Sequence, residues 1–229
     1  MSPSEPRPFW FWMVLWGEDF RNKFLDTCLP SLLAPGNLPA VAARRPANFV
    51  IATTAADWQA MSSTAIFTEL KRHVTPIRLE LPSASPDRPS WQRAVDGKKL
   101  CCEFLFAKKA YAIFINPDHL YADGSMRRLD ELAQQGVEFV SNDAITSVED
   151  APFLRLLGES GLARRDNDIA PIAIAPRQLV GLAVRSMHRM WLALGWDAPY
   201  YWGLSPYAWW RVAGDQGMVV FCLGTEPTL

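Results

Sequence analysis

The stretch Tyr111–Ser125, YAIFINPDHLYADGS, decides how the rest of this chain is interpreted. Its apolar run Tyr111–Ile115 is typical of a buried strand, and the run ends abruptly at the polar sequence 116–118, NPD. Open α/β sheets build their ligand sites from side chains at the carboxyl ends of such strands. The structural alternative is a turn at Asp118 and a helix cap at Asp123, because both residue types are common in turns and caps.

Length and composition indicate a globular protein of one large or two small domains. The chain has 229 residues, of which 49% are hydrophobic and 21% are charged, and this composition excludes a disordered chain. The net charge of −1 offers no basic excess for binding a nucleic acid. We predict a single α/β domain over 1–229, in which 9–145 is the ligand-binding core and 146–229 covers the ligand edge.

The cysteines and the N-terminal segment indicate a cytoplasmic protein. The four cysteines form no CxxC pair, and with only three histidines the chain shows no zinc-site spacing. Reduced thiols in a cytoplasmic protein are the simpler interpretation. The apolar run Phe9–Trp16 has eight residues, whereas a membrane-spanning helix needs about 20. We therefore predict a first buried strand there and no transmembrane segment.

Strand and helix patterns alternate over the first two thirds of the chain. The predicted strands are Phe9–Trp16, Asn48–Thr53, Val74–Leu81, Tyr111–Ile115 and Val137–Ser141. The predicted helices are Glu18–Leu33, bent or ended near Pro30, a helix from an N-cap at Asp57 to about Lys71, Trp91–Lys109 and Gly124–Gly136. Such alternation predicts an α/β fold with a mainly parallel (mixed) sheet and helices on both faces.

The C-terminal third has a different pattern. Two helices are predicted at Ala151–Leu162 and Ala175–Leu194, and a last strand at Met218–Leu223. The stretch Trp191–Trp210 contains five of the ten tryptophans and three of the five tyrosines. It is interpreted as core, as a surface on which sugar rings stack, or as a patch that contacts protein or places the chain at the periphery of a membrane.

Polar residues follow several predicted strands where a parallel sheet would bring them to one edge. These strand ends are Trp16-Gly17, Thr53-Thr54, Asn116–Asp118 and Ser141–Asp143. No glycine-rich dinucleotide or P-loop motif follows the first strand, and no GxSxG elbow is present. The remaining chemistry is a carboxylate edge that holds a divalent cation, Mg²⁺ or Mn²⁺, together with a phosphate.

Four segments carry a resemblance to a known family. Trp16-Gly17, followed by FLDTCLPSLLAPGNLPA (24–40) and FVIATT (49–54), resembles the N-terminal half of bacterial nucleotide-diphospho-sugar transferase-like proteins of the glycosyltransferase A fold. FINPDHLYADGS (114–125) resembles the strand and acidic turn that carry the DxD motif of that fold. The resemblance covers roughly residues 10–145 and implies an enzyme that moves a sugar, of the hexosyl class, from a nucleotide-diphosphate-sugar donor to an acceptor.

The resemblance also implies roles for individual residues. It implies a Mn²⁺ or Mg²⁺ site at Asn116, Asp118 and Asp123, in which Asn116 stands where the motif has its first acid. The donor-binding residues that it implies are Trp16, Gly17, Thr53, Thr54 and Asp57.

Catalytic residues are less well marked by the sequence. Enzymes of this fold that invert the sugar use an acid near the acceptor, and Asp143, Asp166 and Asp168 are the candidates on predicted loops. His188 is the candidate histidine, and its alternative role is a packed helical residue. The neutral Asn116 and the lack of an obvious base leave a second interpretation open, a non-catalytic relative that binds sugar nucleotides or assembles with other proteins.

Overall fold

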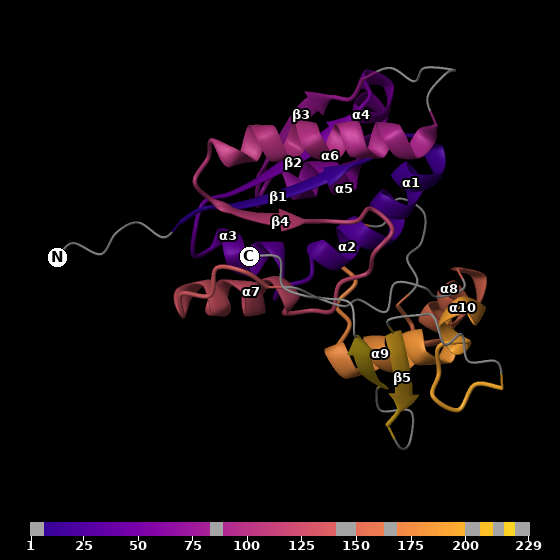
Figure 1. The fold of residues 1–229 in the computed structure, drawn as a ribbon. Coiled ribbons are helices and arrows are strands. Elements are labelled where there is room, and N and C mark those ends of the chain that lie inside the picture. The colour runs from indigo at the N-terminus through magenta and orange to yellow at the C-terminus, as the bar shows by residue number, and fades with distance from the viewer. Residues whose placement is uncertain are drawn as a thin grey trace. The chain divides into compact units, whose positions relative to one another are not determined.

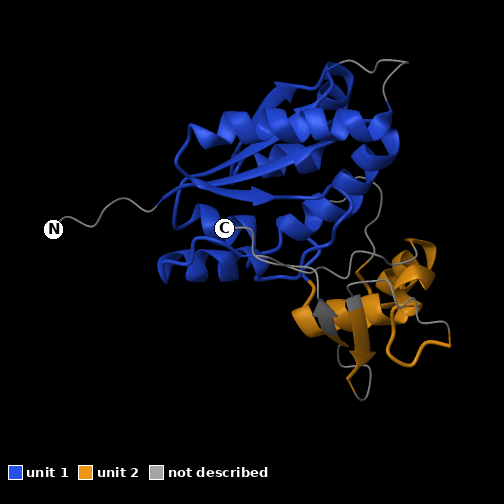
Figure 2. Ribbon diagram, viewed as in Figure 1, with its two compact units in different colours: residues 1–140, 164–173 blue, residues 141–163, 174–229 orange. Residues whose placement is uncertain are grey.

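The computed structural model describes residues 7–82, 89–140, 150–162, 169–199, 207–212 and 218–222. The chain divides into two compact units (Figure 2), residues 1–140 with 164–173 and residues 141–163 with 174–229, called unit 1 and unit 2. The change of pattern that we expected near residue 145 lies outside the described residues. A single domain that spans both units stays a prediction.

Unit 1 is built on a four-stranded sheet in which every pairing is parallel (Figure 1). The strands are β1 (Phe9–Val14), β2 (Ala47–Thr53), β3 (Thr75–Glu80) and β4 (Tyr111–Phe114), in the order β3-β2-β1-β4. Phe9 pairs with Ala47 on one side and with Tyr111 on the other, so β1 is a central strand. The predicted parallel α/β sheet is confirmed, and none of its described strands is antiparallel.

Helices cover both faces of this sheet, as predicted. The helical elements of unit 1 are α1 (Glu18–Lys23), the π-helical turn η1 (Phe24–Cys28), α2 (Leu29–Leu32), α3 (Leu38–Ala42), α4 (Ala55–Ser62), α5 (Ala65–Leu70), α6 (Ser90–Phe106) and α7 (Ser125–Gln134). The alternating side chains of β1 separate two apolar layers. Phe9, Phe11 and Met13 lie in the larger layer with the other helices, whereas Trp10 and Trp12 face α6.

The helix predicted to bend or end near Pro30 changes its type just before that residue. Residues 18–32 are helical throughout, but the π-helical turn η1 separates α1 from α2. Pro30 has no N–H to donate and its ring excludes the usual helical carbonyl position four residues earlier, so it sits in the first turn of α2. The wider turn before it accommodates the proline without ending the helix.

Two predictions in unit 1 are wrong. Thr54, and not Asp57, is the N-cap of α4, and the helix expected to reach about Lys71 is divided into α4 and α5, with Thr64 as the second cap. Residues 137–140 form no strand, and Phe139 and Val140 are 78% and 46% exposed. The VEFV pattern alternates too briefly to specify a strand without a paired neighbour.

Unit 2 contains α8 (Asp150–Glu159), α9 (Pro176–Arg185), α10 (Arg189–Leu192) and the antiparallel strands β5 (Tyr207–Arg211) and β6 (Met218–Cys222). The single helix predicted over 175–194 is wrong, because it ends at Arg185 and α10 starts anew from His188. The buried Ser186 hydroxyl donates to the Leu182 carbonyl oxygen, 2.8 Å away, at the end of α9. Among the described helices of the whole chain, none is long and apolar enough to cross a membrane.

Candidate functional site

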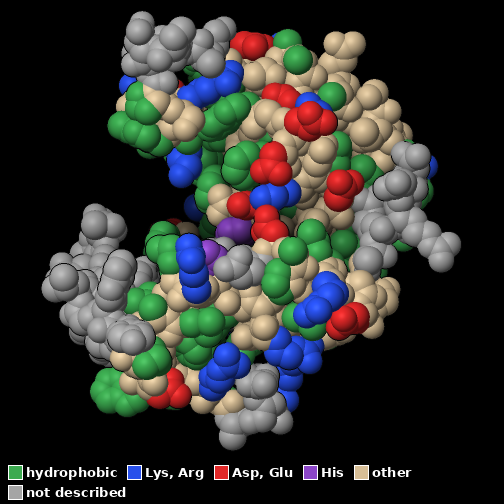
Figure 3. All heavy atoms as spheres, turned by 90° about the vertical axis from the view of Figure 1, so that its right-hand side faces the viewer, with side chains coloured by type: hydrophobic (Ala, Val, Ile, Leu, Met, Phe, Trp, Pro, Cys, Tyr) green, Lys and Arg blue, Asp and Glu red, His purple; other side chains and the backbone are tan. Residues whose placement is uncertain are grey.

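The candidate site is the sheet edge where β1 and β4 end. The chain runs from β1 to β2 and β3 on one side and then returns to place β4 on the other side of β1, so the strand order reverses between β1 and β4. Ligands of open α/β sheets bind outside the carboxyl ends of strands at such a reversal. The upper half of Figure 3 faces this end of unit 1, where acidic and basic side chains lie interspersed.

A buried carboxylate organises the turn that follows β1. Asp57, which is 7% exposed, accepts hydrogen bonds from the Gly17 N–H (3.0 Å), the Thr54 hydroxyl (2.8 Å) and Arg21 Nη1 (2.9 Å). Burial by itself raises the pKa of Asp57, but these three donors outweigh it and hold the pKa below its ordinary value. Three of the predicted donor-binding residues, Gly17, Thr54 and Asp57, are therefore brought together, with the carboxylate of Asp57 engaged by its own protein neighbours.

Gly17 is the exposed member of this group. Its φ of 84° lies in the left-handed region that side chains disfavour, and no atom lies within 4 Å of the place where a Cβ would be. The backbone at the end of β1 is thus open to a ligand. A glycine at this position adopts the positive φ without strain and leaves the backbone accessible to a ligand.

The two remaining donor-binding predictions differ in exposure. Thr53 is fully buried, and its hydroxyl has no hydrogen-bond partner among the described residues. Trp16 is half-buried on the α6 side of the sheet, where the guanidinium of Arg93 stands 5.3 Å from its ring. Of the strand-end residues expected to face a nucleotide, Trp16, Gly17 and Thr54 reach the surface.

Asn116, at the end of β4, is bound by its neighbours through both backbone and side chain. Its N–H donates to the Tyr121 hydroxyl (3.3 Å), and its carbonyl oxygen accepts from the Cys28 thiol (3.4 Å) and from the His119 N–H (3.2 Å). Its side-chain nitrogen lies 3.2 Å from His119 Nε2. With the Asn116 amide as donor, Nε2 of His119 is the acceptor and its ring proton lies on Nδ1.

Three titratable groups around Asn116 were not singled out from the sequence. Burial lowers the pKa of His119, against the opposing charge of Asp118. Burial also raises the pKa of the Tyr121 phenol and of the Cys28 thiol, and nearby Asp118 adds to both shifts. All three groups are neutral at physiological pH, so they can donate or accept hydrogen bonds but carry no charge. Of the three, only His119 had a sequence signal, its position directly after Asp118.

The two acids of the predicted metal site have different surroundings. Asp118 is exposed, and it makes no hydrogen bond or ion pair with any described residue. Asp123 Oδ1 accepts a 2.6 Å hydrogen bond from the Gly36 N–H, so one of its oxygens fixes the loop before α7. Within the described parts of the chain, no three or more His, Cys, Asp or Glu residues gather as they would around a metal ion. Asp118 is thus the carboxylate that this loop offers to a ligand.

Asn37 and Ser31 hold the loop that carries these residues, and neither was predicted as a functional residue. The buried Asn37 amide donates to the Ser31 and Ala122 carbonyl oxygens at 2.8 and 3.1 Å and accepts from the Met126 N–H at 3.0 Å. The Ser31 hydroxyl accepts from the Tyr121 N–H at 3.0 Å. These bonds fix residues 116–126 against α2 and α3 and set the position of Asp118.

The predicted catalytic residues are not brought into this site by the described structure. Asp143, like Asp166 and Asp168, lies outside the described residues. His188 belongs to unit 2, where it is the N-cap of α10 and its Nδ1 accepts from the Met190 N–H at 3.2 Å. His188 is therefore a helix cap, whereas the sequence pattern predicts a position within a helix.

The aromatic stretch of unit 2 has both interior and surface members. Trp209 is 3% exposed and packs with Val184 and Met187, whereas Trp196 and Trp210 are 75% and 44% exposed. Residues 200–206 of the stretch lie outside the described residues. Part of the stretch is therefore core, and part of it is available for contacts.

Comparison with known proteins gives no further guide to the site. The chain matches no protein-family model, no curated protein and no solved structure. Its chemistry is therefore inferred from the geometry alone: an open glycine turn after β1, an exposed carboxylate after β4 and a neutral imidazole beside it.

Proposed function

We propose that this protein binds a nucleotide-diphosphate sugar at the carboxyl ends of β1 and β4 and transfers its sugar, as a glycosyltransferase of the A type. The observation that carries the proposal is the reversal of strand order beside β1, with the Gly17 turn on one strand end and the exposed Asp118 on the next. This is the location that open α/β sheets use for nucleotides. The segments that resemble the family contain both residues.

The metal expected from the resemblance fits this site only in part. Asp123 already uses Oδ1 to accept from Gly36, and Asn116 offers only a neutral amide oxygen because its nitrogen lies against His119, so the trio is a weak set of ligands for a cation held mainly by protein. Mg²⁺ binds through one or two carboxylates together with substrate phosphates, and Asp118 alone meets that requirement. We propose that Mn²⁺ or Mg²⁺ arrives with the diphosphate, whose charge it neutralises.

Titration calorimetry with UDP, GDP and their sugars, with and without Mn²⁺, tests the proposal. Asp118→Asn should weaken Mn²⁺-dependent binding about tenfold, because a charge-assisted contact contributes about 1.5 kcal/mol or more. Asp19→Asn is the matched control, since Asp19 is an exposed acid on α1, and it should bind as the wild type does. If no nucleotide binds, or if both variants bind equally, the proposed site is wrong.

A second candidate function is binding without turnover. The neutral amide of Asn116 and the bond between Asp123 Oδ1 and the Gly36 N–H favour it, because catalysis by the metal-dependent members of such a family needs a firmly held cation. Purified protein that binds a sugar nucleotide but neither transfers nor hydrolyses the sugar would support this candidate. Release of the nucleoside diphosphate in proportion to enzyme concentration would instead support the transferase.

A further inference from the structure

Helix α6 is apolar on its buried face and along one exposed flank. Its inner face places Gly97, Cys101 and Leu105 against the sheet, and a Cβ on Gly97 would lie 2.5 Å from Val14 Cγ1, so the helix packs closely there. The exposed flank carries a line of exposed apolar side chains, which we call the α6 stripe. Its members are Trp91 (63% exposed), Val95 (48%), Cys102 (exposed) and Phe106 (92%).

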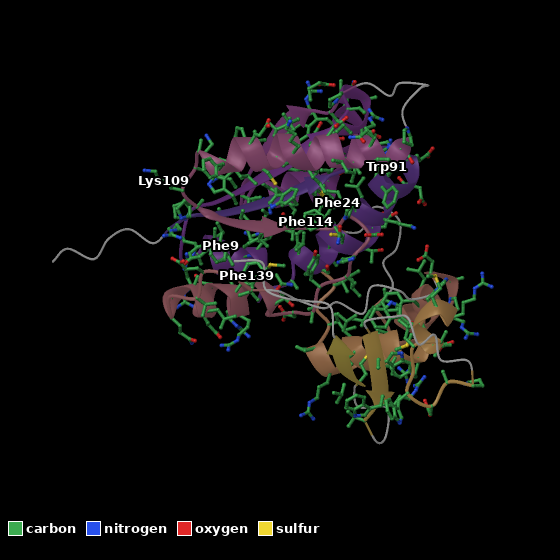
Figure 4. The ribbon with its side chains drawn as sticks, in the orientation of Figure 1. Phe9, Phe24, Trp91, Lys109, Phe114 and Phe139 are labelled. Atoms are coloured by element: carbon green, nitrogen blue, oxygen red, sulfur yellow. The ribbon has the colours of Figure 1, made fainter. Side chains whose placement is uncertain are left out.

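The spacing of these residues places them along one side of the helix, where the exposed Lys98 stands between Val95 and Cys102. Steps of four, seven and four residues return to nearly the same side of an α-helix, so the four side chains project in one direction. The stripe is about 22 Å long at a rise of about 1.5 Å per residue. Figure 4 labels Trp91 in the first turn of this helix and Lys109, three residues after its last residue. The side of α6 opposite the sheet is polar, with Gln92, Asp96, Lys99 and Glu103, so the exposed apolar stripe on its flank needs another explanation.

Basic residues are in excess in and just after this helix, and three of them lie over aromatic rings: Arg93 over Trp16, Lys98 over Phe114 and Lys108 over Trp10. Residues 90–109 contain two acids, Asp96 and Glu103, and five bases, Arg93, Lys98, Lys99, Lys108 and Lys109. Lys98 and Lys99 are exposed beside the stripe, and Lys99 lies 3.8 Å from Glu103, whereas Lys108 and Lys109 follow Phe106. A basic excess in this segment contrasts with the net charge of −1 for the chain.

We propose that the α6 stripe binds the surface of an anionic lipid bilayer. Helices that lie in the membrane interface combine Trp, Phe and aliphatic residues on one side with flanking lysines, as α6 does. The lysines would contact anionic headgroups while the stripe enters the boundary between headgroups and acyl chains. A protein partner is disfavoured by the same composition, because lysine is depleted from the centres of protein–protein interfaces.

Co-sedimentation of the full chain with vesicles tests this proposal. Vesicles of phosphatidylcholine with phosphatidylglycerol should bind the protein at low salt and release it at high salt, whereas pure phosphatidylcholine should bind little. Lys98→Gln with Lys99→Gln should weaken binding about 25-fold, because each juxtamembrane lysine contributes about fivefold. Val95→Ser with Phe106→Ser should weaken it about tenfold or more, since both remove apolar contact area.

Matched control variants separate the stripe from exposed residues in general. Phe20→Ser removes an aromatic side chain that is 43% exposed on α1, and Arg127→Gln with Arg128→Gln removes two exposed bases on α7. Both controls should bind vesicles as the wild type does. Absence of binding to anionic vesicles, or equal losses in stripe and control variants, would overturn the proposal. So would a dimer that lacks vesicle affinity and becomes monomeric on Phe106→Ser, because the stripe would then be an interface between copies.

Discussion

Replacing Asp57 by asparagine should destabilise unit 1 by about 2–3 kcal/mol, since each hydrogen bond to a charged group contributes about 1.5–3 kcal/mol. The carboxylate accepts from Gly17, Thr54 and Arg21, and an amide can accept on one side only and must donate on the other. The loss is smaller than the sum of the three bonds. Gly17 is exposed and the Arg21 side chain is 21% exposed, so both donors recover hydration.

Urea unfolding at neutral pH, followed by circular dichroism, measures this loss of unfolding free energy. Asp19→Asn is the control, because the exposed Asp19–Lys23 pair, at 3.5 Å, should contribute less than about 0.5 kcal/mol. A loss for Asp57→Asn below about 1 kcal/mol would show that the three donors do not depend on the charge.

The same variant has a defined dependence on pH. The folded-state pKa of Asp57 lies below its ordinary value of 3.8, so its stabilisation is complete above that value and is lost as the pH falls through the folded-state pKa. The difference between wild type and Asp57→Asn should therefore shrink in acid. A difference that stays constant to the acid unfolding limit would refute the assignment of the charge.

Two further predictions concern buried groups. Asp130→Ala should cost about 3–5 kcal/mol of unfolding free energy in the same urea assay, because Asp130 is fully buried and its loss would leave the charge of Arg45, whose side chain is 4% exposed, without its partner. Adding Arg45→Met should recover part of this loss. An Asp130→Ala variant as stable as the wild type would contradict the pairing. Iodoacetamide should label Cys102 in the native protein but not Cys28 or Cys101, because burial raises the pKa of both buried thiols, that of Cys101 to about 12. Peptide mass mapping identifies the labelled cysteines, and labelling of Cys28 in the native protein would contradict its burial.

Much of the fold was predictable from long patterns in the sequence. The apolar runs in β1 and β2 suit strands covered on both faces, and the helical patterns between strands imply parallel pairing. The errors fell on short patterns. Thr54 caps α4 three residues before Asp57, the acid predicted as the cap, and the helix predicted over 175–194 ends with Ser186 as its C-cap. Residues 137–140 lack the cross-strand partner that would make an alternating pattern a strand.

The site was predictable only as a location. A polar sequence after an apolar strand identified the end of β4, but it did not show that Asn116 and Asp123 bond within the protein. The Asn116 side chain contacts His119 three residues away, but the Asp123 carboxylate and the Asn116 carbonyl bond to Gly36 and Cys28, which lie more than 80 residues earlier in the chain. Local sequence contains no information on such contacts until the sheet order is known.

The central position of β1 has a consequence for how the sheet assembles. β1 pairs with β2 over six residues and with β4 over four, and β4 has no second neighbour among the described strands. The partner of β4 was synthesised about a hundred residues earlier, so its contacts close the longest loop in the sheet and should form last. Native-state hydrogen exchange should therefore find β4 opening at a lower free energy than β2. A ligand that binds at Asp118 in the folded protein would stabilise β4 against this local opening. Ligand binding should therefore slow amide hydrogen exchange in Tyr111–Phe114.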